Sequence, residues 1–231
     1  MNINEVMLEL KNCGNENTKK TLIKHGAKEP FFGVKVEDLK KIKKKTKINH
    51  KLALELFATG NSDAMYLASM IADITIMTKS EIQKWAKEAY WHYLSEHAVP
   101  SVAAIHKDGF SIALKWIDKK EERFASAGWA TLSAILSKTP NDELDIKEIK
   151  ILLKRAEKEI HTSENRTRYA MNNFVISVGS YIPELTKVAI QSADKIGKVS
   201  VNMGGTSCKV PLASDYFAKI VKMGRVGKKR K

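Results

Sequence analysis

The segment AYWHYLSEHAV, residues 89–99, gathers aromatic, imidazole and carboxylate side chains within eleven positions. Its aromatic residues, Tyr90, Trp91 and Tyr93, are three in four positions, so on a helix they must occupy more than one face. Core packing accounts for one or two of them, and we expect at least one to be partly exposed. An exposed aromatic ring on a basic surface can stack on a sugar or an unpaired base.

The histidines of this segment suit proton transfer, because imidazole titrates near neutral pH. Ordinary hydrogen bonding at a helix surface is the competing interpretation. His92 and His97 are five residues apart, which is poor spacing for a shared metal ion on one helix, and the other histidines are scattered. Cys13 and Cys208 show no paired spacing, so they favour reduced, cytoplasmic thiols over a zinc cluster. The sequence predicts no metal and no cofactor.

Charge is the strongest global signal. The chain has 231 residues, with 40 Lys and Arg against 26 Asp and Glu, which gives a net charge of +14. Such an excess attracts polyanions, of which nucleic acid is the usual one, although it also promotes solubility. A membrane surface is disfavoured as a partner, because no helix combines a basic face with a bulky apolar one. No apolar run is long enough to span a bilayer, and the N-terminal segment has acids where an export signal needs bases.

The elements that must position these residues are helical. Apolar residues recur with helical spacing over about ten stretches: 3–10, 39–42, 52–57, 64–71, 81–93, 112–116, 120–136, 146–153, 164–178 and 212–221. One more helix is predicted to begin at Pro183. Short helices in pairs roughly 35–45 residues apart are typical of helical-repeat solenoids. A globular helical bundle is the competing architecture. Trp85, Trp116 and Trp129 lie in apolar helical contexts and are predicted to be core residues.

One segment breaks the helical pattern. Residues 198–211, KVSVNMGGTSCKVP, alternate around a Gly-Gly turn and predict a short β-hairpin. An apolar face with Val199 and Val201 would pack on the last repeat as a cap. The other face would carry Lys198 and Lys209, and Met203 at the tip is a candidate wedge for a nucleic-acid groove.

The stretch GAKEPFFGVKVEDLKKI, residues 26–42, supports a family assignment. It resembles the N-terminal signature of the DNA alkylation repair family, whose known members include AlkD-like glycosylases. The resemblance implies an all-α, HEAT-like helical-repeat solenoid (an α-α superhelix), here with the C-terminal hairpin. We expect residues 1–223 to form one repeat domain and residues 224–231 to form a basic, flexible tail. The resemblance also implies that duplex DNA lies on a concave basic surface.

Active members of that family release cationic alkylated purines, a reaction in which a carboxylate stabilises the positively charged sugar. Trp91 matches the family's tryptophan, but the position one helical turn later is Ser95. Glu96 is the next carboxylate, and on a regular helix it is turned by about 100° from that face. A second family aromatic aligns with Asn173. The family's phosphate-clamping arginine falls near Ser126, one turn after Arg123.

These features predict a DNA-binding HEAT-repeat protein that recognises damaged, distorted or branched DNA, with little or no glycosylase activity. The DNA-contacting candidates, besides the hairpin residues, are Tyr90, Trp91, Arg123, Arg166 and Arg168; the last two begin a helix whose N-terminal dipole favours phosphate. One alternative is an active glycosylase for alkylated purines that uses Glu96. Another is a scaffold that binds an acidic protein. A monomer is expected.

Overall fold

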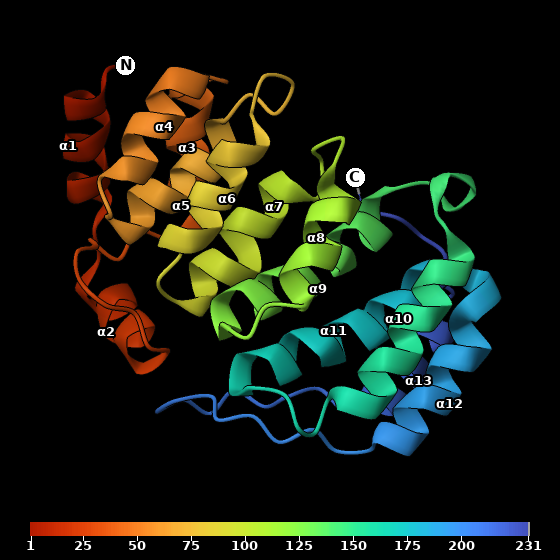
Figure 1. Ribbon diagram of the computed structural model, residues 1–231. Coiled ribbons are helices and arrows are strands. Elements are labelled where there is room, and N and C mark those ends of the chain that lie inside the picture. Colours follow the sequence, from red (N-terminus) through yellow and green to blue (C-terminus); the bar gives the residue numbers. More distant parts are fainter. Residues whose placement is uncertain (231) are drawn as a thin grey trace. The chain divides into compact units, whose positions relative to one another are not determined.

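The computed structural model describes residues 1–230, and every regular element in that range is helical (Figure 1). The chain divides into two compact units. The first comprises residues 1–106 and 203–207, and the second comprises residues 107–202 and the chain from 208 onward. Within residues 1–230, no helix combines the length and the apolar character needed to cross a bilayer.

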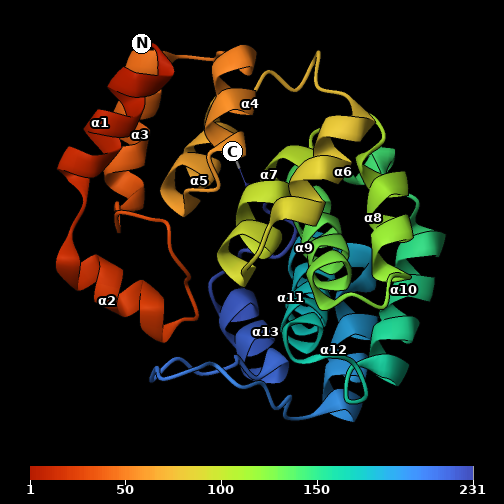
Figure 2. The ribbon, with the colours of Figure 1, turned by 60° about the vertical axis from the view of Figure 1, so that its left-hand side comes forward.

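The first unit contains seven α-helices and one π-helical turn: α1 (Ile3–Cys13), α2 (Glu16–Lys24), α3 (Val36–Thr46), α4 (His50–Ala58), α5 (Ser62–Ile71), α6 (Lys79–Glu88), the turn η1 (Leu94–Ala98) and α7 (Val99–Ala103). Figure 2 shows α1, α3, α4 and α5 side by side, as their packing contacts also require. In its core, Phe57 of α4 stacks on Trp85 of α6 with ring centroids 4.1 Å apart. Burial of such aromatic rings is a major part of the stabilisation of a small core.

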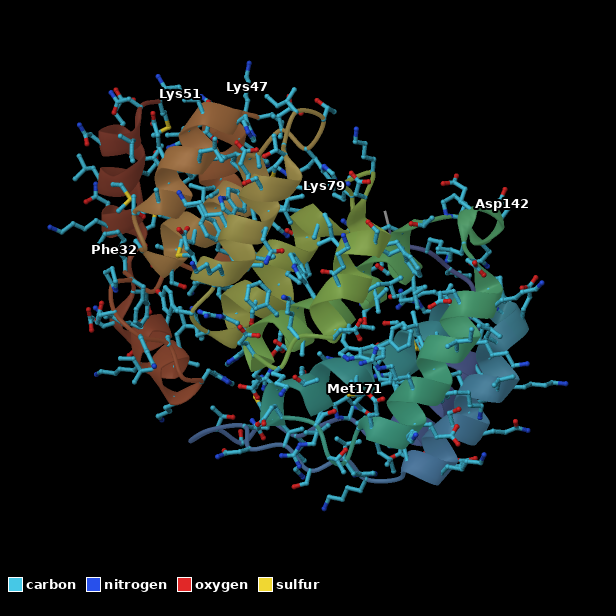
Figure 3. All side chains as sticks on the ribbon, in the orientation of Figure 1. Phe32, Lys47, Lys51, Lys79, Asp142 and Met171 are labelled. Carbon is cyan, nitrogen blue, oxygen red and sulfur yellow. The ribbon has the colours of Figure 1, made fainter. Side chains whose placement is uncertain are left out.

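Local sequence signals define several helix starts in this unit. Asn61 caps α5, since its side chain accepts hydrogen bonds from the backbone N–H groups of Asp63 and Ala64. Thr78 and Glu81 form a reciprocal capping box at the start of α6. The lysine-rich helix α3 exposes its basic side chains, and Figure 3 shows Lys47 and Lys51, which follow it, projecting away from the ribbon.

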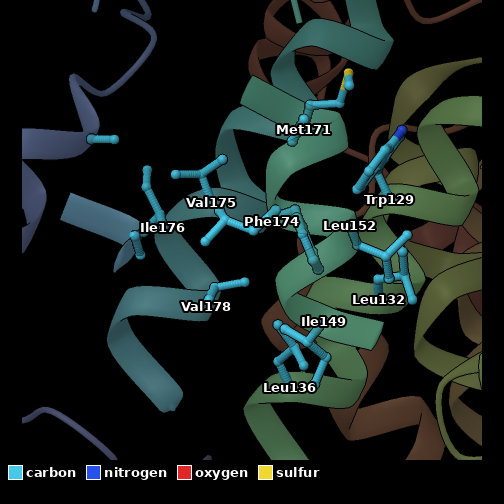
Figure 4. Packing of buried hydrophobic residues seen from close by; sticks show 14 of the residues in the cluster. Trp129, Leu132, Leu136, Ile149, Leu152, Met171, Phe174, Val175, Ile176 and Val178 are labelled. Atoms are coloured by element: carbon cyan, nitrogen blue, oxygen red, sulfur yellow. The ribbon is translucent and has the colours of Figure 1, made fainter. Parts of the chain in front are cut away.

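The second unit contains α8 (Gly109–Ile117), α9 (Glu122–Lys138), η2 (Asn141–Glu143), α10 (Ile146–Glu159), α11 (Asn165–Tyr181), η3 (Pro183–Leu185), α12 (Thr186–Ile196) and α13 (Ala213–Lys222). Figure 4 shows its core, in which Trp129 of α9 meets Phe174 of α11 with ring centroids 5.0 Å apart. Trp85, Trp116 and Trp129 are each at most 2% exposed, so their predicted core positions are confirmed.

Two glycines of the second unit allow helices to approach closely. A Cβ on Gly128 of α9 would lie 2.8 Å from the backbone nitrogen of Ile117 and 2.9 Å from the carbonyl of Ala113, both in α8. A Cβ on Gly179 of α11 would overlap the Phe217 ring of α13. Because cores are close-packed, neither position has room for a side chain.

The predicted β-hairpin at residues 198–211 is wrong, because no β-strand occurs anywhere in residues 1–230. Helices satisfy several polar groups of this segment instead. In the second unit, Asn202 donates its N–H to the Asn165 side chain at 2.7 Å, and the Asn172 amide donates to the carbonyl of Pro211 at 2.9 Å. In the first unit, Gly205 donates its N–H to the carbonyl of Lys24 at the end of α2. A two-stranded ribbon is marginal in water, and these helix contacts outcompete strand pairing.

An ion-pair network connects α10 to α12. The Glu157 carboxylate accepts hydrogen bonds from Lys154 at 2.8 Å, from the Ser192 hydroxyl at 2.8 Å and from Lys195 at 3.1 Å. The bond from Lys154 is the main cause that lowers the pKa of Glu157 from 4.5 to about 2. The carboxylate therefore stabilises the folded state above its unfolded pKa, and this contribution is lost as the pH falls toward 2.

We expect Glu157→Gln to lower the free energy of unfolding by about 1 kcal/mol at pH 7, since the side chain is only partly screened by solvent. The difference between variant and wild type should shrink at pH 3. Urea unfolding of both proteins at the two pH values measures it. An equal difference at both pH values would contradict a role for the ionised carboxylate.

Candidate nucleic-acid interface

The aromatic segment is not the continuous helix that its spacing suggested. Helix α6 ends at Glu88, and Tyr90 and Trp91 lie in the linker that follows. The chain resumes a helical course at His92 and then widens into the π-helical turn η1, in which the N–H of Val99 bonds to the carbonyl of Leu94. Such π-turns shift the side chains that follow them and often occur at functional sites.

Trp91 is a buried structural residue. It is 7% exposed, and its indole N–H donates to the Ser62 hydroxyl at 2.9 Å, at the start of α5. Its ring also lies 5.2 Å from that of Tyr93, which stacks on Tyr66 at 4.5 Å. This tryptophan is therefore committed to contacts within the first unit.

Tyr90 and Tyr93 are half-buried, in accord with the expectation of partial exposure. The Tyr90 hydroxyl donates to the carbonyl of Lys28 at 3.3 Å, and burial raises the pKa of that phenol. Burial also raises the pKa of Tyr93, so both rings stay neutral at physiological pH. Neutral phenol rings do not suit acid–base chemistry near pH 7, so stacking is the role that we expect for any exposed part of them.

The carboxylate expected of a glycosylase is missing at its usual position. Ser95, four residues after Trp91, is 3% exposed and lies within the π-turn. Glu96 lies in the same turn and is 7% exposed, so its carboxylate is enclosed by protein. Asn173 of α11, which aligns with a family aromatic, is half-buried, and Ser126 of α9 is 1% exposed.

Asp63 organises the distinctive stretch near the N-terminus. One oxygen of its carboxylate accepts the N–H groups of Phe32 at 2.6 Å and Gly33 at 3.0 Å, and the other accepts the N–H of Val34 at 3.1 Å. In addition, Ser62 donates its N–H to the carbonyl of Pro30. Figure 3 labels Phe32 at this loop. Asp63 is 2% exposed, and burial raises the pKa of its carboxyl against the opposing effect of the three donors.

Local sequence gives no sign of this role of Asp63, because an acidic residue in the first turn of a helix is ordinarily explained by the helix dipole alone. Gly33 gives a signal instead: its φ is +77° and a Cβ there would lie 2.7 Å from the Lys19 nitrogen, so only glycine fits the turn. A glycine turn that exposes three successive N–H groups needs an acceptor. The nearby N-terminus of α5 supplies it and, through Ser62, holds Trp91 as well.

The arginine candidates lie in the second unit, on α9 and α11. The guanidinium of Arg123 lies 5.7 Å from the Phe124 ring centroid, and that of Arg166 lies 4.5 Å from the Tyr169 ring centroid. Arg168 is half-buried, and its Nε is a buried donor without a hydrogen-bond acceptor in residues 1–230. All three residues lie in the first turns of α9 and α11, and these two helices pack against each other.

A carboxylate already lies at the N-terminus of α11, where a phosphate was expected. Glu122 of α9 accepts the backbone N–H of Arg166 at 2.6 Å. This contact uses the same N-terminal donors and dipole that favour an anion. The site consequently combines arginine side chains with one internal acidic group.

The three DNA-contacting candidates in residues 198–211 differ in exposure and in the unit to which they belong. Lys198 and Lys209 are exposed in the second unit, and Met203 is half-buried and belongs to the first unit. The described residues contain no group of three or more His, Cys, Asp and Glu side chains arranged to hold a metal ion.

Comparison with known proteins defines the class. The family model described as "DNA alkylation repair enzyme" matches residues 6–207. A solved structure, described as "A new family of proteins related to the HEAT-like repeat DNA glycosylases with affinity for branched DNA structures", matches with a TM-score of 0.94 and 37% identity, covering 100% of this chain and 98% of that one. The predicted all-α, HEAT-like fold is thus confirmed, apart from its hairpin.

The chain belongs to the DNA alkylation repair family, as its N-terminal stretch suggested. Two uncharacterized relatives come from Listeria. Lin0241 of Listeria innocua is 37% identical and Lmo0209 of Listeria monocytogenes is 36% identical, each over 217 residues that cover 91% of this chain and 93% of the relative.

Proposed function

We propose that this protein binds branched or distorted DNA through phosphate contacts and releases little or no alkylated base. The observation that carries the proposal is Ser95: a buried, neutral side chain stands where the reaction needs an accessible carboxylate. Without that charge, the positively charged sugar of the transition state loses its main electrostatic stabilisation.

Charge and likeness support DNA as the partner. The net charge of +14 favours a polyanion. The solved structure with a TM-score of 0.94 represents proteins described as having affinity for branched DNA. Arg123, Arg166 and Arg168 supply cations at the ends of two adjacent helices, and exposed Lys198 and Lys209 add two more. Such contacts provide affinity without reading the base sequence.

Two assays run side by side test the proposal. The first titrates the protein against a four-way junction and against a linear duplex of the same sequence at low salt, and we expect tighter binding to the junction. The second incubates excess protein with methylated duplex DNA and measures free purine base, for which we expect no release above background. Absence of binding to either DNA at low salt would overturn the proposal.

The π-turn favours one alternative specifically, an alkylpurine glycosylase that uses Glu96. Because η1 departs from α-helical geometry, the estimate that Glu96 points about 100° from the Trp91 face no longer holds. We still expect wild type and Glu96→Gln to release equal, background amounts of base, because Glu96 is 7% exposed. Base release by wild type that the variant loses would establish the alternative.

A further inference from the structure

The basic C-terminal segment, expected to be a flexible tail, makes specific contacts with the second unit. Gly227 donates its N–H to the carbonyl of Ser180 at 2.8 Å, and Arg230 donates its N–H to the carbonyl of Ser137 at 2.7 Å. The Lys229 ammonium donates to the carbonyl of Leu136 at 2.8 Å. Lys231, the last residue of the predicted tail, lies outside the described residues.

The acceptors of these bonds are carbonyl groups in the last turns of α9 and α11. The last four carbonyl groups of any helix accept no hydrogen bond from within that helix, so they need donors from elsewhere. Leu136 is a clear case, because the residue four positions later is Pro140, which has no N–H to donate. The tail supplies the donors that the sequence after each helix does not.

Side-chain contacts reinforce this arrangement. Arg230 donates from Nε to the Tyr181 hydroxyl at 2.7 Å, and its guanidinium lies 5.8 Å from the centroid of the same ring. Cations at helix C-termini also interact favourably with the helix dipole. Burial lowers the pKa of Lys229, as expected for an ammonium that is drawn in from solvent toward a backbone carbonyl.

Gly227 shows that the path of the segment is specific. Its φ is +78°, which favours glycine, and a Cβ there would lie 2.8 Å from Cγ of Pro183. A chain that merely trailed into solvent would have no such constraint. The segment therefore packs in a defined position against the C-terminal ends of α9 and α11 and against Pro183. We call this surface its seat.

We propose that residues 225–230 are an intramolecular latch that caps α9 and α11, and that they are not a free nucleic-acid-binding arm. Two of its bonds to helix carbonyls come from the backbone N–H groups of Gly227 and Arg230, and one comes from the Lys229 ammonium. This role does not require DNA. It also means that the charges of Lys229 and Arg230 serve contacts within the protein.

Two full-length variants separate the interpretations. Gly227→Ala retains every charge but strains the seat, whereas Lys228→Ala removes one charge from an exposed side chain between the latch contacts. We expect Gly227→Ala to lower the Tm by about 4 °C. Lys228→Ala should leave it within about 1 °C of wild type, because exposed side chains contribute little. Differential scanning calorimetry without DNA measures both.

Limited trypsin digestion provides a second readout. Cleavage after Lys229 requires the segment to leave its seat, so we expect it to be about tenfold faster in Gly227→Ala than in wild type. Tyr181→Phe, which removes only the acceptor for Arg230, should show a smaller change in the same direction. Equal Tm values and equal cleavage rates for wild type, Gly227→Ala and Tyr181→Phe would overturn the latch and establish a free arm.

Discussion

Asp63→Asn is expected to lower the free energy of unfolding by about 3 kcal/mol, since it disrupts a buried set of hydrogen bonds. The wild-type carboxylate accepts three backbone N–H groups, from Phe32, Gly33 and Val34. An amide has only one acceptor oxygen, so its NH₂ group must face at least one of these donors. The donor then stays buried and unpaired, and the attachment of the loop to α5 is weakened.

The matched control is Asp118→Asn, which makes the same chemical change at a surface ion pair. The Asp118 side chain is 66% exposed and bonds to Arg155 at 2.6 Å. Exposed pairs contribute about 0.2–1 kcal/mol, so this variant should stay within 1 kcal/mol of wild type. Urea unfolding followed by circular dichroism gives both values. Equal losses in the two variants would mean that Asp63 is not the anchor of the loop.

The affinity for a four-way junction is expected to fall by about a thousandfold between 50 and 200 mM salt. This magnitude corresponds to roughly six neutralised phosphates, because each contact releases condensed counterions from the DNA. Fluorescence anisotropy across a salt series gives the slope of log affinity against log salt. A flat dependence would contradict phosphate recognition and would favour an acidic protein as the natural partner.

Single arginine variants show which residues contribute to the slope of log affinity against log salt. Arg123→Gln, Arg166→Gln and Arg168→Gln should each reduce its magnitude by about one unit. Lys51→Gln is the matched control, because it removes the same charge from an exposed position on α4, outside the candidate set. If the arginine variants and the control change the slope equally, only net charge matters and the proposed contacts are wrong.

Glu122 places a negative charge beside the expected phosphate contacts at the start of α11. Its carboxylate occupies the N–H of Arg166 at the start of α11. A phosphate near this helix end would meet a like charge, which weakens binding unless the arginines compensate. The arginine side chains rather than the helix terminus are therefore the main expected source of affinity in this region.

Local sequence patterns were sufficient for most of the helices and for much of the core, but they missed α2 (Glu16–Lys24) and the end of α6 at Glu88. Asn61 and Thr78 are residue types that favour N-caps and do cap α5 and α6, and the apolar spacing around Trp85, Trp116 and Trp129 predicts their burial. These features succeed because helix formation and capping depend on residues within about four positions of one another. The absence of a carboxylate four residues after Trp91 could be recognised only through the resemblance to the family, which implies one at that position.

The hairpin prediction failed because alternation over a few residues is a weak signal when partners are unknown. The pattern at residues 198–211 fits two paired strands, but Asn165, Asn172 and Lys24 provide competing hydrogen-bond partners. Only the folded chain brings those helix residues to the segment. The hairpin prediction rested on the local pattern of residues, which carries no information about hydrogen bonds to distant helices.

The sequence by itself determined the helical class, the family and the loss of the usual catalytic carboxylate. The tertiary structure alone decided that Asp63 binds a loop some thirty residues away, that Trp91 is held by Ser62, and that the basic tail caps two helices. The physical reason is that periodicity and capping are local, whereas a buried carboxylate or a helix-end carbonyl finds its donor only after distant segments pack together.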